Sequence, residues 1–288
     1  MKILVTGAHG QLGYDVCRCL SARRIEHRGV DLSDFDITDR DAVQQYFDSY
    51  SPTAVIHCAA FTAVDRAEIE SALCTRINLN GTQNLAESAA AIGASVMYLS
   101  TDYVFDGREE RPKETGDRTN PLSVYGKTKR MGELAVIAAT NQHFIVRTSW
   151  VFGVHGKNFV KTVLRLSDER DEIRVVSDQI GSPTYTRDLA QLLCDMIQTE
   201  RFGVYHATGS GFCSWAEFAE EILRQSQKQT KVCAIASSEY PTAAIRPHNS
   251  RLSAASLTEN GFTPLPHWKD ALTRYLDEER TCKRRQDL

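Results

Sequence analysis

The stretch from residue 1 to residue 13, Met-Lys-Ile-Leu-Val-Thr-Gly-Ala-His-Gly-Gln-Leu-Gly, decides the fold of this chain. Its apolar run at 3–6 is typical of a buried strand, and a helical pattern follows over 11–22. Between them, Gly7, Gly10 and Gly13 permit a tight turn, a close backbone approach to a pyrophosphate, and close helix–strand packing. The helix N-terminus then offers its N–H groups to an anion. We therefore predict a dinucleotide-binding turn, with a purely structural turn as the alternative.

The pattern that begins at this turn repeats along the first half of the chain. Apolar strand patterns alternate with helical ones at short intervals, which indicates a parallel sheet covered on both faces. The predicted strands are 3–6, 27–30, 54–58, 96–100 and 144–148, and the predicted helices are 11–22, 39–49, 67–92 and 121–140. The predicted fold class is thus α/β, with a doubly wound parallel sheet.

The second half of the chain has a different character. Helical patterns at 158–166, 186–198 and 214–225 are separated by short strand patterns at 174–176, 204–206 and 232–235. Proline, serine and arginine gather in 240–251, as in an ordered loop that borders a site. We predict a dinucleotide-binding domain over 1–150 and a smaller, mainly substrate-binding lobe over 151–288, interleaved with the first domain.

Composition excludes several classes of protein. The 288 residues carry a net charge of −3, which gives no reason to expect a nucleic-acid partner. The eight cysteines form no C-x-x-C pair and no zinc spacing, so we expect reduced thiols and no metal ligands. No apolar run is long enough for a membrane span or a signal peptide. These features predict a cytoplasmic protein that does not bind membranes.

A tyrosine and a lysine carry the chemistry. Tyr125 and Lys129 lie four residues apart, so they share one face of a helix, which we expect to begin with Asn120 as its N-cap and Pro121 in its first position. A nearby cation favours the phenolate, so we expect Lys129 to lower the pKa of Tyr125. Such a phenol exchanges protons with an alcohol or ketone oxygen. The spacing alone is common, but with the glycine turn and Thr101 upstream it indicates a carbonyl reductase.

Longer motifs make the interpretation more specific. They are STDYVFDG at 100–107, RTSWVFG at 147–153, DQIGSPT at 178–184 and RPHNS at 246–250. Together with the glycine turn, they resemble the extended short-chain dehydrogenase/reductase superfamily and, within it, the dTDP-4-dehydrorhamnose reductases. The resemblance runs from Met1 to about Trp268. It implies a Rossmann-type fold and a hydride transfer from NADPH or NADH to C4 of dTDP-4-dehydro-L-rhamnose, a nucleotide sugar.

The resemblance also assigns roles to individual residues. It implies that Tyr125 donates a proton, that Lys129 holds the nicotinamide ribose, and that Thr101 orients the substrate oxygen. The cofactor would contact Gly7, Gly10, Gln11, Leu12, Gly13, Asp31, Asp36, Ile37, Ala60, Phe61, Thr62, Tyr125 and Lys129. The substrate would contact Thr101, Asp102, Trp150, Arg246 and Asn249.

Several of these residues have a second interpretation. Asp31 suits the adenosine ribose and would repel a 2′-phosphate, yet Arg24 and Arg28 lie close enough in sequence to permit NADPH, and Asp31 could instead cap a turn. Trp150 could belong to the core, and Arg246 could form a loop salt bridge. Arg147, inside an apolar strand, is interpreted as a buried paired charge.

Other functions stay open within the same resemblance. Dehydratases of the superfamily carry a glutamate after Thr-Asp, but here Tyr103 follows Asp102, which argues against water elimination. Another sugar-nucleotide reductase or epimerase is possible, and so is a binding role like that of the regulatory subunit of methionine adenosyltransferase. The resemblance also allows a homodimer and a Mg²⁺ ion, for which Asp15 is a surface carboxylate.

Overall fold

A parallel sheet forms the centre of the computed structural model, which describes residues 1–286. It has six strands in the order β10-β5-β4-β3-β1-β2. The strands are β1 (Lys2–Thr6), β2 (Glu26–Val30), β3 (Ala54–His57), β4 (Ser95–Thr101), β5 (His143–Thr148) and β10 (Gly203–His206). All their pairings are parallel, and the prediction of an α/β fold with a doubly wound sheet is confirmed.

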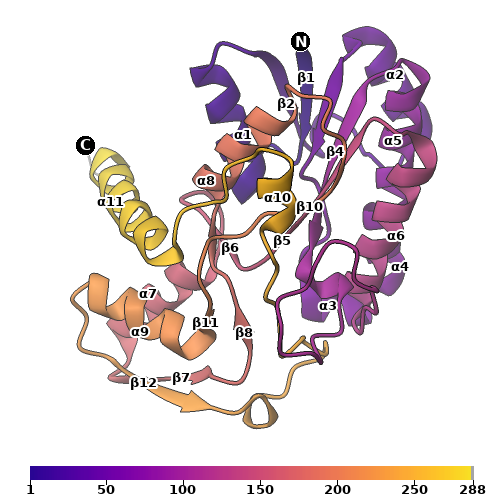
Figure 1. Cartoon of the computed structure of the whole chain (residues 1–288). Coiled ribbons are helices and arrows are strands. Elements are labelled where there is room, and N and C mark those ends of the chain that lie inside the picture. Colours follow the sequence, from indigo (N-terminus) through magenta and orange to yellow (C-terminus); the bar gives the residue numbers. More distant parts are fainter. Residues whose placement is uncertain (287–288) are drawn as a thin grey trace.

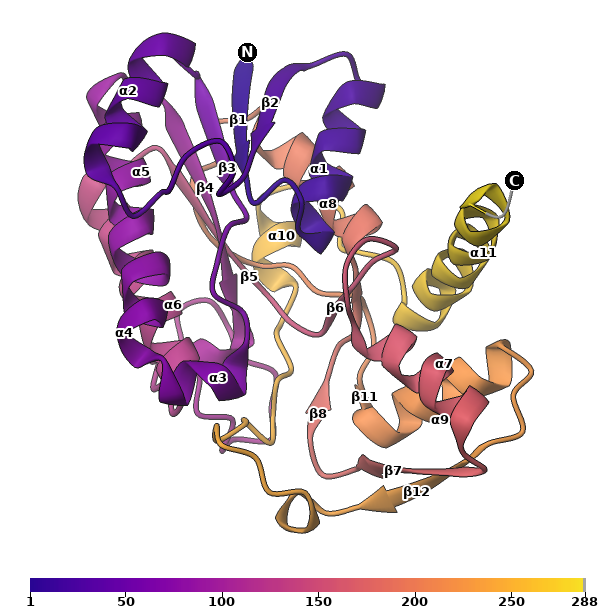
Figure 2. The same ribbon diagram turned by 180° about the vertical axis from the view of Figure 1, so that it is seen from behind.

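Helices cover both faces of this sheet (Figures 1 and 2). On one face α1 (Gln11–Ala22), α8 (Thr186–Met196) and α10 (Ala255–Glu259) share a core with the strands. On the other face lie α2 (Arg40–Tyr50), α5 (Thr82–Ala91) and α6 (Val124–Ala139). Because both faces are covered, β1, β3, β4 and β5 consist largely of buried apolar residues.

A second layer of structure lies beside the carboxyl ends of the strands (Figure 2). Its helices are α7 (Phe159–Glu169), α9 (Trp215–Gln225) and α11 (Trp268–Gln286), and its strand pairs are β7 (Glu172–Val176) with β12 (Lys231–Ile235), β8 (Ile180–Gly181) with β11 (Cys213–Ser214), and β6 (Val151–Phe152) with β9 (Thr184–Tyr185). Phe152, Tyr185, Phe218, Trp268 and Tyr275 are buried together in its core. Between these segments the chain returns to the sheet through α8 and β10.

The helix that carries the tyrosine begins later than its sequence predicts. We expected Asn120 as its N-cap, but α6 begins at Val124, and the Ser123 hydroxyl accepts a hydrogen bond from the Gly126 N–H at 3.1 Å. The Asn120 amide instead donates to Asp106 at 3.0 Å. Both residues are good caps, and this tertiary partner decides between them. Tyr125 therefore lies in the first turn of α6.

The predicted helix over 67–92 is also interrupted. It is divided into α3 (Val64–Ile69), α4 (Ser71–Thr75), a π-helical turn η1 (Arg76–Gly81) and α5. The side chain of Asn78, in η1, is buried and bonds the backbone N–H and C=O of Phe61 at 2.8 and 3.2 Å. The wider turn thus coincides with a side chain that must reach a neighbouring loop.

Two further predictions concern membrane-spanning helices and the state of the cysteines. No helix within residues 1–286 combines the length and apolar character needed to cross a bilayer. The cysteines are free thiols, and Cys19, Cys74, Cys194 and Cys213 among them are buried.

A buried ion pair attaches α6 to the sheet. Glu133 is fully buried and accepts hydrogen bonds from Arg147, on β5, at 2.8 and 2.9 Å. The Ser100 hydroxyl, on β4, donates to the same carboxylate at 2.5 Å. The interpretation of Arg147 as a buried paired charge is confirmed. One carboxylate thus connects α6 to two strands.

We predict that Glu133→Gln lowers the free energy of unfolding by about 3 kcal/mol, because it leaves the buried Arg147 guanidinium without its counter-charge. Urea denaturation at neutral pH measures this change. The matched control is Glu169→Gln, which removes an exposed partner of Arg165 and should cost less than about 1 kcal/mol. Equal losses in the two variants would contradict the role given to Glu133.

Candidate active site

The glycine turn lies where the order of the strands reverses. β1 has β2 on one side and β3 on the other, so the crevice beyond its carboxyl end is a topological switch point. Gly7 has a positive φ of 68°, and a Cβ there would lie 2.6 Å from the Ala59 backbone nitrogen. A Cβ on Gly13 would lie 2.1 Å from the Gly7 carbonyl oxygen. Both positions therefore require glycine for a close backbone approach.

The residues that start α1 present backbone toward this crevice. Gly10 is the N-cap, and no side chain caps the helix. The Gln11 side-chain oxygen accepts hydrogen bonds from the Gly153 N–H and the Asn158 amide, both at 3.1 Å. Leu12 packs against the core under the sheet. The first N–H groups of α1 thus stand available for an anion, while the Gln11 side chain holds the loop after β6.

The acidic residue after β2 stands beside the glycine turn. One oxygen of Asp31 accepts from the His9 N–H at 3.0 Å, and the other accepts from the Leu32 N–H at 2.9 Å. Farther along, Asp36 closes a short turn by accepting from the Thr38 N–H at 2.8 Å. Ile37 packs against Gly81, where a Cβ would come within 2.7 Å of its side chain. Asp31 therefore caps a turn in a position that still borders the dinucleotide crevice.

The segment after β3 connects the crevice to the tyrosine. Ala60, Phe61 and Thr62 lie in the loop that follows that strand, and Phe61 is buried. Its ring belongs to the same apolar cluster as Cys74 and Tyr125. The segment predicted to line the cofactor cleft therefore also packs beside Tyr125.

The residues with the proposed chemical roles come together from two elements. Thr101 ends β4, and its hydroxyl is close enough to Tyr125, on α6, to lower the pKa of that phenol. Lys129, one turn after Tyr125, is buried, and its ammonium lies 4.1 Å from the centre of the Tyr98 ring. The helix and the strand converge because Glu133, on α6, accepts a hydrogen bond from Ser100 on β4 and pairs with Arg147 on β5. The structure thus brings Thr101, Tyr125 and Lys129 to one place.

The pKa expected for the tyrosine is wrong in its direction. Burial raises the pKa of Tyr125, the charge of Asp102 raises it further, and only the Thr101 hydroxyl lowers it. Burial also lowers the pKa of Lys129 to about 7, against the opposing effect of Glu133. Removal from water is thus the largest effect on both groups. The phenol is held in the protonated form, which is the form a proton donor requires.

Trp150 has an unusual backbone at the border of the two layers. Its φ is +48°, and its ring stacks on Trp215 with centroids 3.5 Å apart. A Cβ on Gly181 would lie 2.5 Å from the indole, so only glycine fits beneath it. Trp150 is partly exposed and packs against the core of the second layer. Its ring is thereby fixed in place between Trp215 and Gly181.

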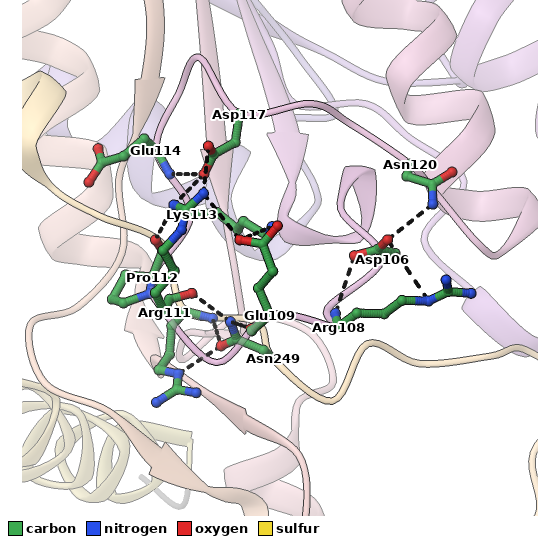
Figure 3. A network of polar contacts seen from close by, with 11 residues as sticks. Asp106, Arg108, Glu109, Arg111, Pro112, Lys113, Glu114, Asp117, Asn120 and Asn249 are labelled. Carbon is green, nitrogen blue, oxygen red and sulfur yellow. Dashed lines mark hydrogen bonds and ion pairs between the residues drawn. The ribbon is translucent and has the colours of Figure 1, made fainter.

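The loop residues predicted to bind substrate are held by other parts of the protein. Arg246 forms a two-pronged ion pair with Asp65 on α3, at 3.0 and 2.6 Å, as the salt-bridge interpretation expected. The buried Asn249 amide donates to the Glu109 carbonyl and, at 2.7 Å, to the Arg111 carbonyl (Figure 3). The sequence does not indicate Asp65 as the partner of Arg246, because the two residues lie 181 positions apart and no local motif surrounds Asp65.

A magnesium ion does not fit at Asp15. This residue is buried, so its interpretation as a surface carboxylate is wrong. Its oxygens accept hydrogen bonds from the Thr186 hydroxyl and from Arg18. Among the described residues, no cluster of three His, Cys, Asp or Glu side chains could hold a metal ion. Asp15 therefore serves to join α1 to α8.

A Rossmann-type sheet, a glycine turn at its switch point and a Thr-Tyr-Lys set beside it define a short-chain dehydrogenase/reductase. The family described as "RmlD substrate binding domain" matches residues 1–281, and the chain belongs to it. A spore coat polysaccharide biosynthesis protein of Bacillus subtilis is 42% identical over 96% of this chain and 97% of its own length. A dTDP-4-dehydrorhamnose reductase of Aggregatibacter actinomycetemcomitans is 39% identical over 94% of this chain and 97% of its own length.

A solved structure gives the same assignment. The dTDP-4-dehydrorhamnose reductase of Bacillus anthracis, determined in complex with NADP, superimposes with a TM-score of 0.94. It is 41% identical, and the match covers 96% of this chain and 100% of that one. The fold, and not only the motifs, is therefore shared along almost the whole chain.

We predict that Gly13→Ala abolishes dinucleotide binding and destabilises the protein by about 1–3 kcal/mol, because the new Cβ would overlap the Gly7 carbonyl. Quenching of protein fluorescence by NADPH measures the binding, and thermal unfolding measures the stability. Gly116→Ala is the control, since a Cβ there meets no atom within 4 Å. Normal NADPH affinity in Gly13→Ala would contradict the assigned turn.

Proposed function

We propose that this protein reduces the C4 ketone of dTDP-4-dehydro-L-rhamnose to dTDP-L-rhamnose, with NADPH or NADH as the reductant. The observation that carries the proposal is the convergence of Thr101, Tyr125 and Lys129 beside the glycine turn. Membership of the family supports it, as do relatives named for this reaction. A cytoplasmic location and a homodimer remain predictions.

The proposed chemistry uses each side chain for what it can do. The reduced nicotinamide, when bound, supplies the hydride. Tyr125 gives its proton to the oxygen of the ketone as negative charge develops there, and its raised pKa keeps that proton in place until then. Thr101, at the end of β4, positions the same oxygen. The reaction therefore needs no acid other than Tyr125.

Lys129 has a charge that depends on its surroundings. Burial lowers its pKa to about 7, and the carboxylate of Glu133, one turn further along α6, opposes this effect. We propose that ribose hydroxyls of the bound cofactor accept hydrogen bonds from the Lys129 ammonium and so favour its charged form. Cofactor binding would then favour the protonated, positively charged form of Lys129.

We predict that Tyr125→Phe lowers kcat at least 100-fold, because it removes only the hydroxyl that donates the proton. The assay follows NADPH oxidation with dTDP-4-dehydro-L-rhamnose. The control is Tyr46→Phe, on the outer helix α2, which should keep full activity.

The same assay separates the competing functions. An epimerase would convert the sugar without net NADPH oxidation, and a binding protein would leave it unchanged. Either result with the wild-type protein would overturn the proposed function. Unchanged turnover by Tyr125→Phe would overturn only the assigned acid.

We also predict that Asp31→Asn shifts the cofactor preference toward NADPH. The carboxylate next to the glycine turn would repel a 2′-phosphate, and asparagine has no such charge while it can still accept from the His9 N–H. The ratio of kcat/KM for NADPH to that for NADH should rise by about 10-fold. An unchanged ratio would mean that the adenosine ribose lies elsewhere.

A further inference from the structure

His57 is a buried imidazole that the proposed chemistry does not use. It ends β3, and both of its ring nitrogens have a partner. Nδ1 lies 2.7 Å from the hydroxyl of Thr6, the last residue of β1, and Nε2 lies 3.0 Å from the hydroxyl of Thr82, the first residue of α5. The ring thus bridges the strand that precedes the glycine turn and a helix that packs against α6.

The partners of Thr82 fix which ring nitrogen carries the hydrogen. A hydroxyl has a single proton. Because a carbonyl can only accept, the Thr82 hydroxyl donates its proton to the Asn78 carbonyl, at 2.9 Å. It therefore accepts from Nε2 of His57, and Nδ1 of the neutral ring accepts from Thr6. Burial, with the charge of Lys129 acting in the same direction, lowers the pKa of His57 to about 3.

The same direction of donation continues to the helix that carries the tyrosine. The Asn78 amide, in η1, donates to the Thr128 hydroxyl on α6 at 3.1 Å. The Thr128 hydroxyl in turn donates to the Tyr125 carbonyl at 3.0 Å. Five hydrogen bonds thus run from Thr6 to Tyr125, each with its donor on the side of the glycine turn. The series is unbroken only while His57 accepts at one nitrogen and donates at the other.

Both partners of the imidazole lie beside parts of the candidate site. Thr6 immediately precedes Gly7, in the turn predicted to hold the pyrophosphate. The His57 ring also packs against Tyr98, with 5.5 Å between ring centres. The Lys129 ammonium lies 4.1 Å from the centre of the same Tyr98 ring. His57 therefore contacts the supports of both the glycine turn and the lysine.

We propose that His57 is a positioning residue, a neutral imidazole that accepts from Thr6 and donates to Thr82 and so holds the glycine turn in register with the helix of Tyr125. The proposal rests on the proposed function, because this register matters where a cofactor at the turn must meet the phenol. An apolar side chain could fill the same space but could make neither hydrogen bond.

Two substitutions separate the two halves of this bridge. The amide of His57→Asn reaches as far as Nδ1, so it can accept from Thr6 but leaves Thr82 without a donor. The longer amide of His57→Gln reaches as far as Nε2, so it can donate to Thr82 but leaves Thr6 without an acceptor. Loss of the Thr82 link should lower kcat about 10-fold at unchanged NADPH affinity, and loss of the Thr6 link should weaken NADPH binding about 10-fold at nearly unchanged kcat.

Quenching of protein fluorescence by NADPH measures the binding, and turnover of dTDP-4-dehydro-L-rhamnose at saturating NADPH measures kcat. The control is His143→Gln, at the first residue of β5 and so at the end of the sheet opposite the crevice. Its ring bonds only a nearby loop carbonyl, that of Thr140, at 2.6 Å. This variant should change neither quantity.

Thr82→Val tests the second link without changing the histidine. It keeps the shape of the side chain and removes the hydroxyl, so it should lower kcat at least as much as His57→Asn, whereas Thr82→Ser should retain turnover. In the double variant with His57→Asn, the two losses should not add, because both substitutions remove the same interaction. Full turnover by Thr82→Val would overturn the proposal, even if a His57 variant failed to fold.

NMR of nitrogen-labelled histidine tests the tautomer in the full-length protein without any substrate, with the His57 signals assigned through His57→Gln. At pH 7 the ring should be neutral, with its hydrogen on Nε2 and with Nδ1 as an acceptor. A protonated ring, or a hydrogen on Nδ1, would overturn the proposal.

Equal losses of NADPH affinity and kcat in His57→Asn and His57→Gln would overturn it as well, because a side chain that only fills the core predicts no such division. The NMR spectrum and NADPH binding require no turnover. A wild-type protein that failed to reduce the keto sugar would therefore refute the proposed function, while these two measurements would still decide whether His57 has the assigned hydrogen bonds.

Discussion

The buried carboxylate of Glu133 is the group on which the geometry of the site depends. It binds Arg147 on β5 and Ser100 on β4, and it projects from the same helix as Tyr125 and Lys129. Because an ion pair without water has few alternative geometries, it sets how α6 approaches the sheet. Ser100 immediately precedes Thr101, so one carboxylate fixes both the hydroxyl and the phenol. The positions of the reacting groups are thus a consequence of core electrostatics.

Within this geometry, burial determines the protonation states of Tyr125 and Lys129. The four-residue spacing predicts a lowered pKa for the tyrosine, but burial raises the pKa of Tyr125 and lowers that of Lys129. Lys129 approaches neutrality and Tyr125 stays protonated. The proposed acid is thus protonated in the free protein, and on the proposed function the charge of Lys129 would depend on the bound cofactor.

Much of this was predictable from local patterns. The strands, the glycine turn and the helix after it depend on neighbouring residues, so the sequence indicates them directly. The other features depend on contacts between residues far apart in the sequence, which no local pattern indicates. Asn120 and Ser123 are comparable N-cap candidates in the sequence, and the hydrogen bond from Asn120 to Asp106 decides between them. Asp15 is buried because it contacts Thr186, which lies 171 residues away in the chain. Likewise, the spacing of Tyr125 and Lys129 reveals a pair but not the depth at which it lies.

Two ties between the sheet and the second layer have a thermodynamic consequence. Gln11 connects the start of α1 to Gly153 and Asn158, and Asp65 holds Arg246 on the loop at 240–251. On the proposed function, a dinucleotide bound at the glycine turn would act on Gln11, which also holds the second layer. Where two ligands contact the same structural element, each ligand changes the binding affinity for the other by the same factor. Contact of the cofactor with Gln11 would then make the affinities for cofactor and sugar nucleotide reciprocal.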